Sequence, residues 1–500
     1  MLRIGRGLAW NWCVAAVLGL TALGVGPTAR AEESWDAVYL SGSKVGHIHT
    51  FIEPVKDKGR ALVRVRVDMA LTFKRLRDKV TMQLQYGTIE TPEGEVLRLD
   101  TRTLVSDQEM RVHGDVIDGK MNLVMDGTGQ RQQQQLDWGI DVRGPYASEQ
   151  SLSRVPIKPG ESRTLRMFVP DVNRVCDMTL TAKSMEDVPL GGGTNRSLLR
   201  VEQTSKLDGK SRPEFNSTLW VDSGGQVLKS LTDNFGGMVT YRTTRDGALA
   251  PNDPGAKFDQ ILTSVVKVTH KINRPGATRD VRYVVRLKDE NPAAVFPTDR
   301  RQTIRPAARP NEAILAVKTA GPDDGAPEAP PADDVFLRPN AMITSQDARV
   351  VRLSQTAVAG ATDPWEKAKR VERWVAKNLA TKNFSVAFAP ASEVAQNLTG
   401  DCTEHGVLTA AMCRAAGVPA RVVVGLVYAE NLDGFGFHLW NEVYVNRRWV
   451  AIDSTFEQDS VDAVHIKLSD SSLDGVAPFE SFLPIVRVMG KLTLEPTEIR

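Results

Sequence analysis

Hydrophobic and polar residues alternate along much of the first half of the chain. Alternation with a period of two is typical of strands that bury one face. It is regular in residues 62–69, 80–86 and 218–221, and turn-forming runs such as residues 223–225 lie between these stretches. The pattern therefore predicts a β-rich domain over residues 32–250, built on a large antiparallel sheet that we expect to be curved.

The next part of the chain contains further strands and then a break in the pattern. Strand-like runs continue at residues 258–271, 280–288 and 313–318. They predict either an extension of the first sheet or a small β subdomain over residues 251–320. Residues 321–335 are rich in proline and acidic side chains, which is typical of a linker. We place the main domain boundary there.

The pattern after the linker changes to helices followed by strands. Residues 336–500 are therefore predicted to form an α+β domain at the C-terminus. The elements predicted in it are a helix that opens at Asp363, a short helix over residues 392–396, a helix over residues 401–416, a hairpin over residues 439–453, an edge strand over residues 464–468 and a closing β segment over residues 483–493.

The helix predicted over residues 401–416 has clear signals at both ends. Hydrophobic residues recur at intervals of three and four along it. Thr399 or Asp401 can cap its start, and Gly417 lies where a left-handed residue would end it. Cys402 therefore falls in the first helical turn.

That position favours a reactive thiol at Cys402. Unpaired N–H groups and the positive end of the helix dipole stabilise a thiolate over a thiol. Asp401 and Glu404 add negative charge nearby and act in the opposite direction. A cationic partner would be needed to compensate, and His438 is the candidate.

The hairpin predicted over residues 439–453 relates the candidate partner to a carboxylate. A two-residue turn would pair Val445 with Arg448, and the same register would place Asp453 opposite Trp440. His438 lies two residues before Trp440 and shares its face of the strand. His438 and Asp453 are then diagonal neighbours, about 7–8 Å apart between backbones.

Asp and His side chains can bridge such a separation. A carboxylate at Asp453 would hold one nitrogen of the His438 ring as a donor. The other ring nitrogen could then take the proton from Cys402. The spacing thus predicts a thiol, an imidazole and a carboxylate acting together.

Four motifs in this region resemble the core of the transglutaminase-like superfamily, in its bacterial exported branch. They are residues 400–405 (GDCTEH), 416–425 (AGVPARVVVG), 437–445 (FHLWNEVYV) and 448–455 (RWVAIDST). The resemblance implies a papain-like Cys-His-Asp core, with Cys402 as nucleophile, His438 as base and acid, and Asp453 as orienting residue. The chain differs from the animal cross-linking enzymes, which carry an aromatic residue directly after the cysteine, in having Thr403 there.

The predicted activity is thiol-dependent acyl transfer or hydrolysis on peptide or amide substrates through a Cys402 thioester. The enzyme would be a cysteine protease, an amidase or an acyltransferase, and it would need no cofactor and no metal ion. The N–H of Cys402 would contribute to an oxyanion hole. A different possibility is a non-catalytic periplasmic binding or scaffold protein that uses the β-rich region.

Composition narrows the class of partner. Lys and Arg together number 63 and Asp and Glu together number 61, so the charges nearly balance. This is not the strongly basic composition typical of nucleic-acid-binding proteins. We therefore expect no nucleic-acid partner, and the expected partner is the peptide or protein substrate that the resemblance implies. The chain also contains neither an HExxH motif nor a nucleotide-binding glycine loop.

Residues 1–31 have the pattern of a signal peptide. Arg3 and Arg6 precede an apolar run over residues 14–25, and the Ala29-Arg30-Ala31 sequence fits a cleavage site. We expect an exported, periplasmic or extracellular protein with no stable membrane span after cleavage. A retained membrane anchor is the other possibility.

Several residues with reactive side chains have simpler structural explanations. Cys413 is predicted to be a buried residue of the 401–416 helix, and Cys176 a strand residue. His405 is expected to pack against the helix or to line the cleft. Arg421 could form an ion pair or contact the substrate, and Glu442 could line the cleft.

Overall fold

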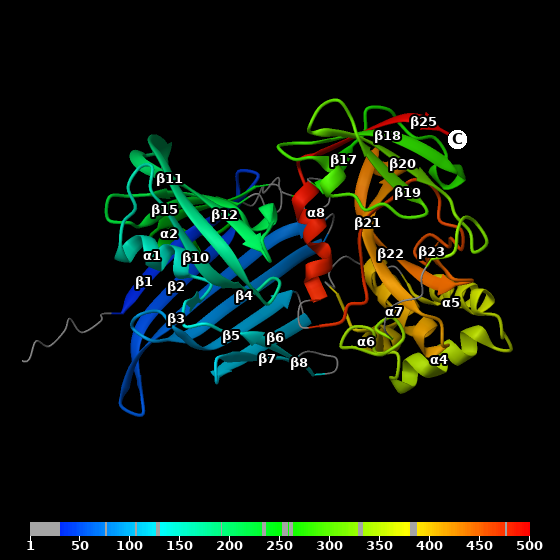
Figure 1. Ribbon diagram of the computed structural model, residues 1–500, viewed down its shortest axis with the longest axis horizontal. Coiled ribbons are helices and arrows are strands. Elements are labelled where there is room, and N and C mark those ends of the chain that lie inside the picture. Colours follow the sequence, from blue (N-terminus) through cyan, green and yellow to red (C-terminus); the bar gives the residue numbers. More distant parts are fainter. Residues whose placement is uncertain are drawn as a thin grey trace, which may run out of the picture.

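The structure is a computed structural model of the chain. It describes residues 31–75, 78–105, 108–126, 131–191, 193–232, 237–252, 259, 264–328, 334–380, 388–475 and 478–500. The predicted signal peptide, apart from Ala31, lies outside the described residues. Figure 1 shows the β-rich first half of the chain beside a C-terminal part that contains most of the helices.

The strands of the first half form one sixteen-stranded sheet within the described residues. Its order is β8-β7-β6-β5-β4-β3-β2-β1-β16-β15-β14-β12-β11-β10-β9, with β13 paired to β12 (Figure 1). The strands are β1 (Glu32–Leu40), β2 (Ser43–Asp57), β3 (Arg60–Arg75), β4 (Asp78–Glu90), β5 (Val96–Val105), β6 (Gln108–Ile117), β7 (Lys120–Asp126), β8 (Gln132–Asp137), β9 (Val142–Arg143), β10 (Ser162–Val169), β11 (Arg174–Pro189), β12 (Asn195–Leu207), β13 (Lys210–Ser211), β14 (Ser217–Val221), β15 (Val227–Thr232) and β16 (Met238–Thr243). Neighbouring strands are antiparallel except β9 and β10, which are parallel. The predicted large antiparallel β-rich region is confirmed.

The alternating sequence pattern explains which face of each strand is buried. In β7, Met121, Leu123 and Met125 are buried, whereas Lys120 is exposed and Asn122 is half-buried. Successive side chains of a strand point to opposite faces of the sheet. One face therefore packs into a core, and the other contacts solvent.

The connection between β8 and β9 shows that the sheet is strongly curved. These strands are its two edges, yet only residues 138–141 join them. Such a connection spans at most about 18 Å between Asp137 and Val142. Strands are about 4.8 Å apart, so the edges of a flat sheet of this size would be several times more distant. Trp138 and Val142 share one core cluster with Leu123 of β7 and Phe168 of β10. The sheet therefore curls until its edges are close together.

The remaining strands form two smaller sheets. A five-stranded sheet has the order β17-β22-β21-β24, with β23 paired to β22, and a four-stranded sheet has the order β19-β20-β18-β25. Their strands are β17 (Val266–Lys267), β18 (Asp280–Leu287), β19 (Gln302–Pro306), β20 (Glu312–Lys318), β21 (Ala420–Ala429), β22 (Gly434–Val445), β23 (Arg448–Ile452), β24 (His465–Ser471) and β25 (Leu492–Ile499).

Strands on both sides of the predicted linker share these two sheets. β18 pairs with β25, and β17 pairs with β22. Buried residues of β18 and β20 also share a core cluster with residues of β21, β22 and β24. In the predicted run over residues 258–271, β17 is the only strand, and residues 258 and 260–263 lie outside the described residues. The segment thus packs with the C-terminal part, and the division into domains stays a prediction.

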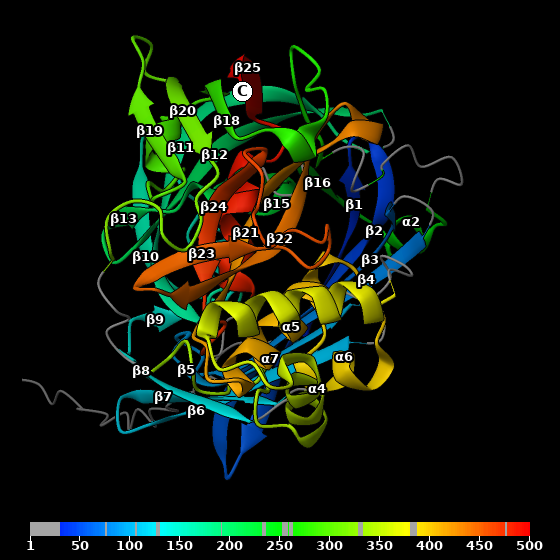
Figure 2. The same ribbon diagram turned by 90° about the vertical axis from the view of Figure 1, so that its right-hand side faces the viewer.

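The helices of the C-terminal part cover one side of the β21–β23 strands (Figure 2). They are α4 (Ala348–Val358), α5 (Pro364–Asn378), α6 (Ala391–Asn397) and α7 (Cys402–Ala415). Two short helices, α1 (Ala147–Arg154) and α2 (Arg245–Leu249), belong to the first half of the chain. Buried residues of α4 to α7 and of β21 to β23 form one hydrophobic core. The helices predicted at residues 363, 392–396 and 401–416 are confirmed.

The prediction of a β segment over residues 483–493 is wrong for its first half. Residues Leu483–Val488 form helix α8, and the strand β25 begins only at Leu492. Pro484 at the start of the helix is compatible with this, because a proline at the first turn loses no hydrogen bond. Leu483 packs against the large sheet, and Ile485 against the C-terminal cores. An apolar run of this length fits either a strand or a helix. Here the segment is a helix that packs between the large sheet and the C-terminal part of the chain (Figure 1).

The described part of the predicted linker lies against the β22–β23 hairpin. The N–H of Glu328 donates to the carbonyl of Arg447 (2.8 Å), and the Tyr444 hydroxyl donates to the carbonyl of Glu328 (3.1 Å). Residues 329–333 lie outside the described residues. Among the described helices, none has the length and apolarity needed to cross a membrane.

Candidate active site

Helix α7 is capped as its sequence predicts. The Asp401 carboxylate accepts a hydrogen bond from the N–H of Thr403 (2.9 Å), and the Glu404 carboxyl group accepts one from the N–H of Asp401 (2.9 Å). This reciprocal arrangement is a capping box. At the other end Gly417 has a φ of 79°, which a glycine adopts without strain. The helix boundaries place Cys402 at its first residue.

Cys402 is half-buried beside the helical core. Its neighbour Glu404 is almost fully buried, and burial together with the Asp401 charge raises the pKa of the Glu404 carboxyl group. A carboxyl group with a raised pKa carries less negative charge near neutral pH. Glu404 therefore destabilises a thiolate at Cys402 less than its sequence position suggests.

Close packing joins the first half of α7 to β22. A Cβ atom on Gly406 would lie 2.0 Å from Cδ2 of Leu439, so only glycine allows the helix to approach the strand this closely. Asn441 of β22 donates a hydrogen bond from its side chain to the carbonyl of Gly406 (2.9 Å). The hydroxyl groups of Thr409 and Ser454 are also hydrogen-bonded, at 2.8 Å. The helix that carries Cys402 is thus fixed to the strands that carry the other predicted site residues.

The β22–β23 hairpin has the predicted register. Val445 pairs with Arg448, and the pairing continues to Asn441 opposite Ile452. Both turn residues have positive φ, 48° at Asn446 and 59° at Arg447. This is the conformation of a two-residue type I′ turn, whose twist matches that of the strands.

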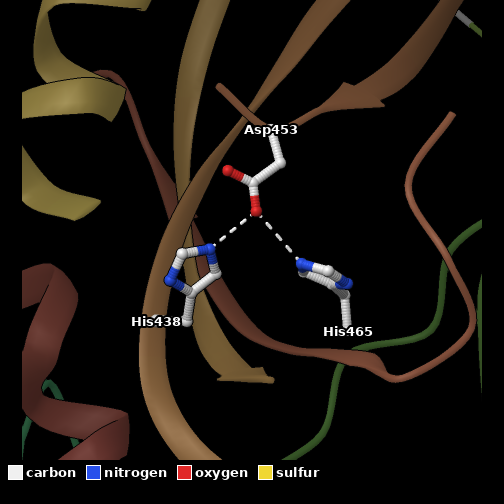
Figure 3. Close-up of side chains that lie close together, drawn as sticks. All are labelled: His438, Asp453 and His465. Atoms are coloured by element: carbon white, nitrogen blue, oxygen red, sulfur yellow. Dashed lines mark hydrogen bonds and ion pairs between the residues drawn. The ribbon is translucent and has the colours of Figure 1, made fainter. Parts of the chain in front are cut away.

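The register brings His438 and Asp453 into contact. Nε2 of His438 lies 2.7 Å from Oδ2 of Asp453, and both side chains are buried (Figure 3). Oδ1 of Asp453 accepts a hydrogen bond from the N–H of Thr455 (2.8 Å). Burial alone would raise the pKa of Asp453, but the His438 and His465 rings outweigh it and hold this pKa well below its usual range. The carboxylate is therefore ionised and fixed in orientation.

A second imidazole, which the sequence did not predict, contacts the same carboxylate. Nε2 of His465 lies 3.1 Å from Oδ2 of Asp453, so the carboxylate oxygen lies between two rings (Figure 3). Nδ1 of His465 lies 2.7 Å from Oδ1 of Asp462. The only sequence signal was a histidine in a predicted edge strand, and the pairing of that strand with β21 could not be inferred from spacing.

Comparison with protein families identifies this part of the chain. Residues 351–454 match the model of the transglutaminase-like superfamily. This segment is a transglutaminase-like domain. Cys402, His438 and Asp453 all lie within the matched residues, whereas His465 lies beyond them. A search of curated proteins found no match.

Solved structures similar to the chain are distant. One is a "putative cysteine protease" from Cytophaga hutchinsonii, with 15% identity and a TM-score of 0.31, covering 46% of this chain and 90% of that one. Another is a β-barrel-like protein of a domain of unknown function from Brucella abortus, with 14% identity and a TM-score of 0.32, covering 42% of this chain and 95% of that one. TM-scores this low do not establish a shared fold.

His405 packs within the transglutaminase-like domain, close to the histidine pair. Its Nδ1 lies 2.8 Å from the carbonyl of Asp401 in its own helix, and the ring is buried. Burial lowers the pKa of His405, while the charge of Asp453 raises it and that of His438 lowers it further. His405 thus packs against its own helix, which is one of the two possibilities that the sequence left open.

Arg421 and Glu442 of the transglutaminase-like domain belong to an ionic network in which Glu442 and Lys467 are buried. Arg421 contacts Glu442 (2.6 Å) and Asp470 (2.9 Å), and Lys467 contacts Glu442 (2.9 Å). Burial raises the pKa of Glu442, but Lys467 and Arg421 outweigh it and lower this pKa to about 2. Of the possibilities that the sequence left open, the ion pair is the one observed for Arg421.

Aromatic side chains surround the histidines. The His438 ring is stacked on Trp440, with centroids 6.1 Å apart, and lies 5.0 Å from Phe456. Trp440 is buried, whereas Phe456 is 49% exposed. Phe456 is thus an apolar residue at the surface directly beside His438.

The two other described cysteines differ from Cys402 in their surroundings. Cys176 lies in strand β11 and Cys413 is buried in helix α7, as predicted, and Cys176 is buried as well. Burial raises the pKa of Cys176 to about 11 and that of Cys413 to about 12. Both thiols are therefore poor nucleophiles, and they provide internal references for the reactivity of Cys402.

Ligand-type atoms of His438, Asp453 and His465 lie within 4.8 Å of one another. A metal ion could use such a set of donors. The hydrogen bonds already account for the arrangement, because Oδ2 of Asp453 is the acceptor for both rings. The geometry alone therefore does not require an ion.

Proposed function

We propose that the transglutaminase-like domain is a thiol-dependent enzyme that transfers or hydrolyses acyl groups of peptide or amide substrates. Cys402 would attack the carbonyl carbon and form a thioester. His438 would accept the thiol proton and later donate it to the leaving amine. Asp453 would hold the His438 ring. The observation that carries this proposal is the buried hydrogen bond between His438 and Asp453 beside the helix that begins at Cys402.

The hydrogen bond at Asp453 fixes the useful tautomer of His438. Because Nε2 faces a carboxylate, it must carry a hydrogen. In the neutral ring Nδ1 then has a lone pair, and it has no hydrogen-bond partner among the described residues. A base with its lone pair on Nδ1 can take a proton from a thiol. This supports His438 as the residue that activates Cys402.

Helix α7 supports Cys402 as the nucleophile in two ways. The first residue of a helix experiences the positive end of the helix dipole, which stabilises a thiolate and the oxyanion that forms during attack. The N–H of Cys402 would donate to that oxyanion. The packing of α7 on an antiparallel sheet supports a papain-like arrangement, in which the nucleophile and the base come from a helix and a strand.

Hydrolysis and transfer to an amine would use the same three residues. In both reactions the thioester forms first, and either water or an amine then attacks it. The two differ in which acceptor reaches the thioester. We further propose that the enzyme acts outside the cytoplasm, with the signal-like sequence of residues 1–31 as support.

Trapping of the acyl-enzyme tests this proposal directly. The protein would be incubated with an activated ester of an N-acyl amino acid, quenched in acid and analysed by peptide mass spectrometry. We expect the acyl group on Cys402, removal of the group by hydroxylamine, and a large decrease in labelling for His438→Ala. Cys176 and Cys413 should stay unlabelled. Absence of the group from Cys402, or equal labelling of the His438→Ala variant, would instead favour the binding or scaffold role.

A further inference from the structure

His465 is held between two buried carboxylates. Its Nε2 faces Oδ2 of Asp453 at 3.1 Å, and its Nδ1 faces Oδ1 of Asp462 at 2.7 Å. The side chains of all three residues are at most 4% exposed. Figure 3 shows the Asp453 carboxylate between the rings of His438 and His465. Water therefore cannot replace either of these contacts.

This arrangement determines the protonation of the His465 ring. A neutral imidazole has one N–H and one lone pair. In this position the lone pair would face a carboxylate oxygen, which is repulsive. Both nitrogens therefore carry hydrogens, and His465 is a cation. Burial lowers the pKa of His465, but the hydrogen bonds to Asp453 and Asp462 outweigh it, so that this pKa is raised.

A cation at His465 weakens the stabilisation that the Asp453 carboxylate gives to protonated His438. Both rings use the same oxygen, Oδ2, so the negative charge of Asp453 is already partly neutralised. The ring centroids of His438 and His465 are also only 5.6 Å apart, and like charges at this distance repel. Both effects oppose protonation of His438.

We propose that His465 is a positioning residue, kept cationic by Asp462, that orients Asp453 and moderates the basicity of His438. The inference rests on the proposed function and names a further part of the same site. Without His465, the Asp453 carboxylate would hold the proton on His438 more tightly. With it, part of the negative charge of Asp453 is already neutralised by the second ring on Oδ2, and the carboxylate holds the His438 proton less tightly.

Other charged groups near His465 act from a greater distance. The titratable or charged side chains that affect Asp453 or Asp462 from neighbouring elements are His405 of α7, Glu372 of α5, Arg301 before β19 and Tyr283 of β18. None of these four side chains is hydrogen-bonded to the His465 ring within the described part of the chain, whereas Asp453 and Asp462 are. The two carboxylates therefore dominate the protonation of His465.

The variant Asp462→Asn separates the charge of His465 from its packing. Asn is close in shape to Asp and can still accept the hydrogen bond that Asp462 receives from the N–H of Val464. The matched control is Asp470→Asn, which removes a carboxylate from β24 whose partners are Arg421 and Lys467 and not His465. Both variants should fold.

The measurement is ¹⁵N NMR of histidine-labelled protein across a pH series, with the metal content of the same samples. We expect His465 to carry two N–H groups at pH 7 in the unaltered protein and one in Asp462→Asn. The pH at which His438 loses its proton should be higher in Asp462→Asn than in the unaltered protein and should stay unchanged in Asp470→Asn. The alkaline limb of the acyl-transfer pH profile should move with it.

Three results would overturn the inference. One is a His465 ring with a single N–H at pH 7 in the unaltered protein, which is informative even if the variant does not fold. Another is an unmoved His438 titration in a folded Asp462→Asn variant. The last is a stoichiometric bound metal ion whose removal changes the histidine spectra. The NMR signals do not depend on Cys402 reactivity, so failure of the proposed enzymatic function would be seen separately.

Discussion

His438 and Asp453 meet across the β22–β23 hairpin, with Nε2 of the ring 2.7 Å from Oδ2 of the carboxylate. The contact orients the ring and stabilises its charged form. Asp453→Asn keeps the shape but replaces the acceptor with a neutral amide, which can also favour the wrong tautomer. We expect the rate of ester hydrolysis to fall by about 10²- to 10⁴-fold, as for comparable changes in other triads.

A nearby carboxylate provides the control for this prediction. Asp459 lies in the same connection after β23 but forms its ion pair with Arg373, at 4.0 Å. Asp459→Asn should leave the rate almost unchanged. Circular dichroism of both variants would confirm the fold. Equal rates for the two variants would show that Asp453 has only a structural role.

Glycine at position 406 allows α7 to pack against β22. In Gly406→Ala the new methyl group would lie 2.0 Å from Cδ2 of Leu439, a side chain that is only 1% exposed and has little room to move. Overpacking of this kind costs about 1–3 kcal/mol of unfolding free energy. Urea denaturation would measure it.

Gly436→Ala is the matched control, because a Cβ at Gly436 would have no atom within 4 Å. It lies in the same strand, β22. We expect its stability to change by a few tenths of a kcal/mol at most. If both alanine variants were equally stable, the close approach of α7 to β22 would be incorrect.

Glu372 of α5 is a buried carboxyl group that should make the stability depend on pH. It is 3% exposed, and its Oε1 has no hydrogen-bond partner among the described residues. Burial, together with the charges of Asp459 and Asp453, raises its pKa from 4.5 to about 8. Between these values the folded protein keeps a proton that the unfolded chain has lost. Stability should therefore fall as the pH rises from 4.5 to 8, by at most about 1.4 kcal/mol per pH unit from this group.

Glu372→Gln removes that titration. Urea denaturation at pH 5 and pH 8 should show a smaller loss of stability on raising the pH than in the unaltered protein. Glu366→Gln, on the exposed face of the same helix, tests for a general effect of removing a charge and should keep the original pH dependence. A variant at Glu372 with unchanged pH dependence would mean that this carboxyl group is ionised in the folded protein at pH 5.

Local signals explain which parts of the site could be predicted. The capping residues and Gly417 lie next to the two ends of α7 and determine where the helix begins and ends. The two-residue turn determines the register of the hairpin. Both elements follow from contacts between residues close in sequence. The pairing of His438 with Asp453 could therefore be predicted before the fold was known.

Long-range contacts explain what could not be predicted. His465 reaches Asp453 only because β24 pairs with β21, an element some forty residues earlier in the chain. The pairing of β25 with β18 spans an even longer separation. The apolar sequence of α8 fits a strand equally well. The helix packs against both the large sheet and the C-terminal core, and these contacts come from residues far away in the sequence. Periodicity contains none of this information.

The pH dependence of thiol alkylation tests the central claim most directly. Iodoacetamide would be applied across a pH series, and each cysteine would be quantified by mass spectrometry in the unaltered protein and in His438→Ala. We expect Cys402 to react well below the pH of an ordinary thiol, to lose this advantage in His438→Ala, and to react far faster than the buried Cys176 and Cys413. If Cys402 titrates as an ordinary thiol, or reacts identically in His438→Ala, the assignment of Cys402 as an activated nucleophile is wrong.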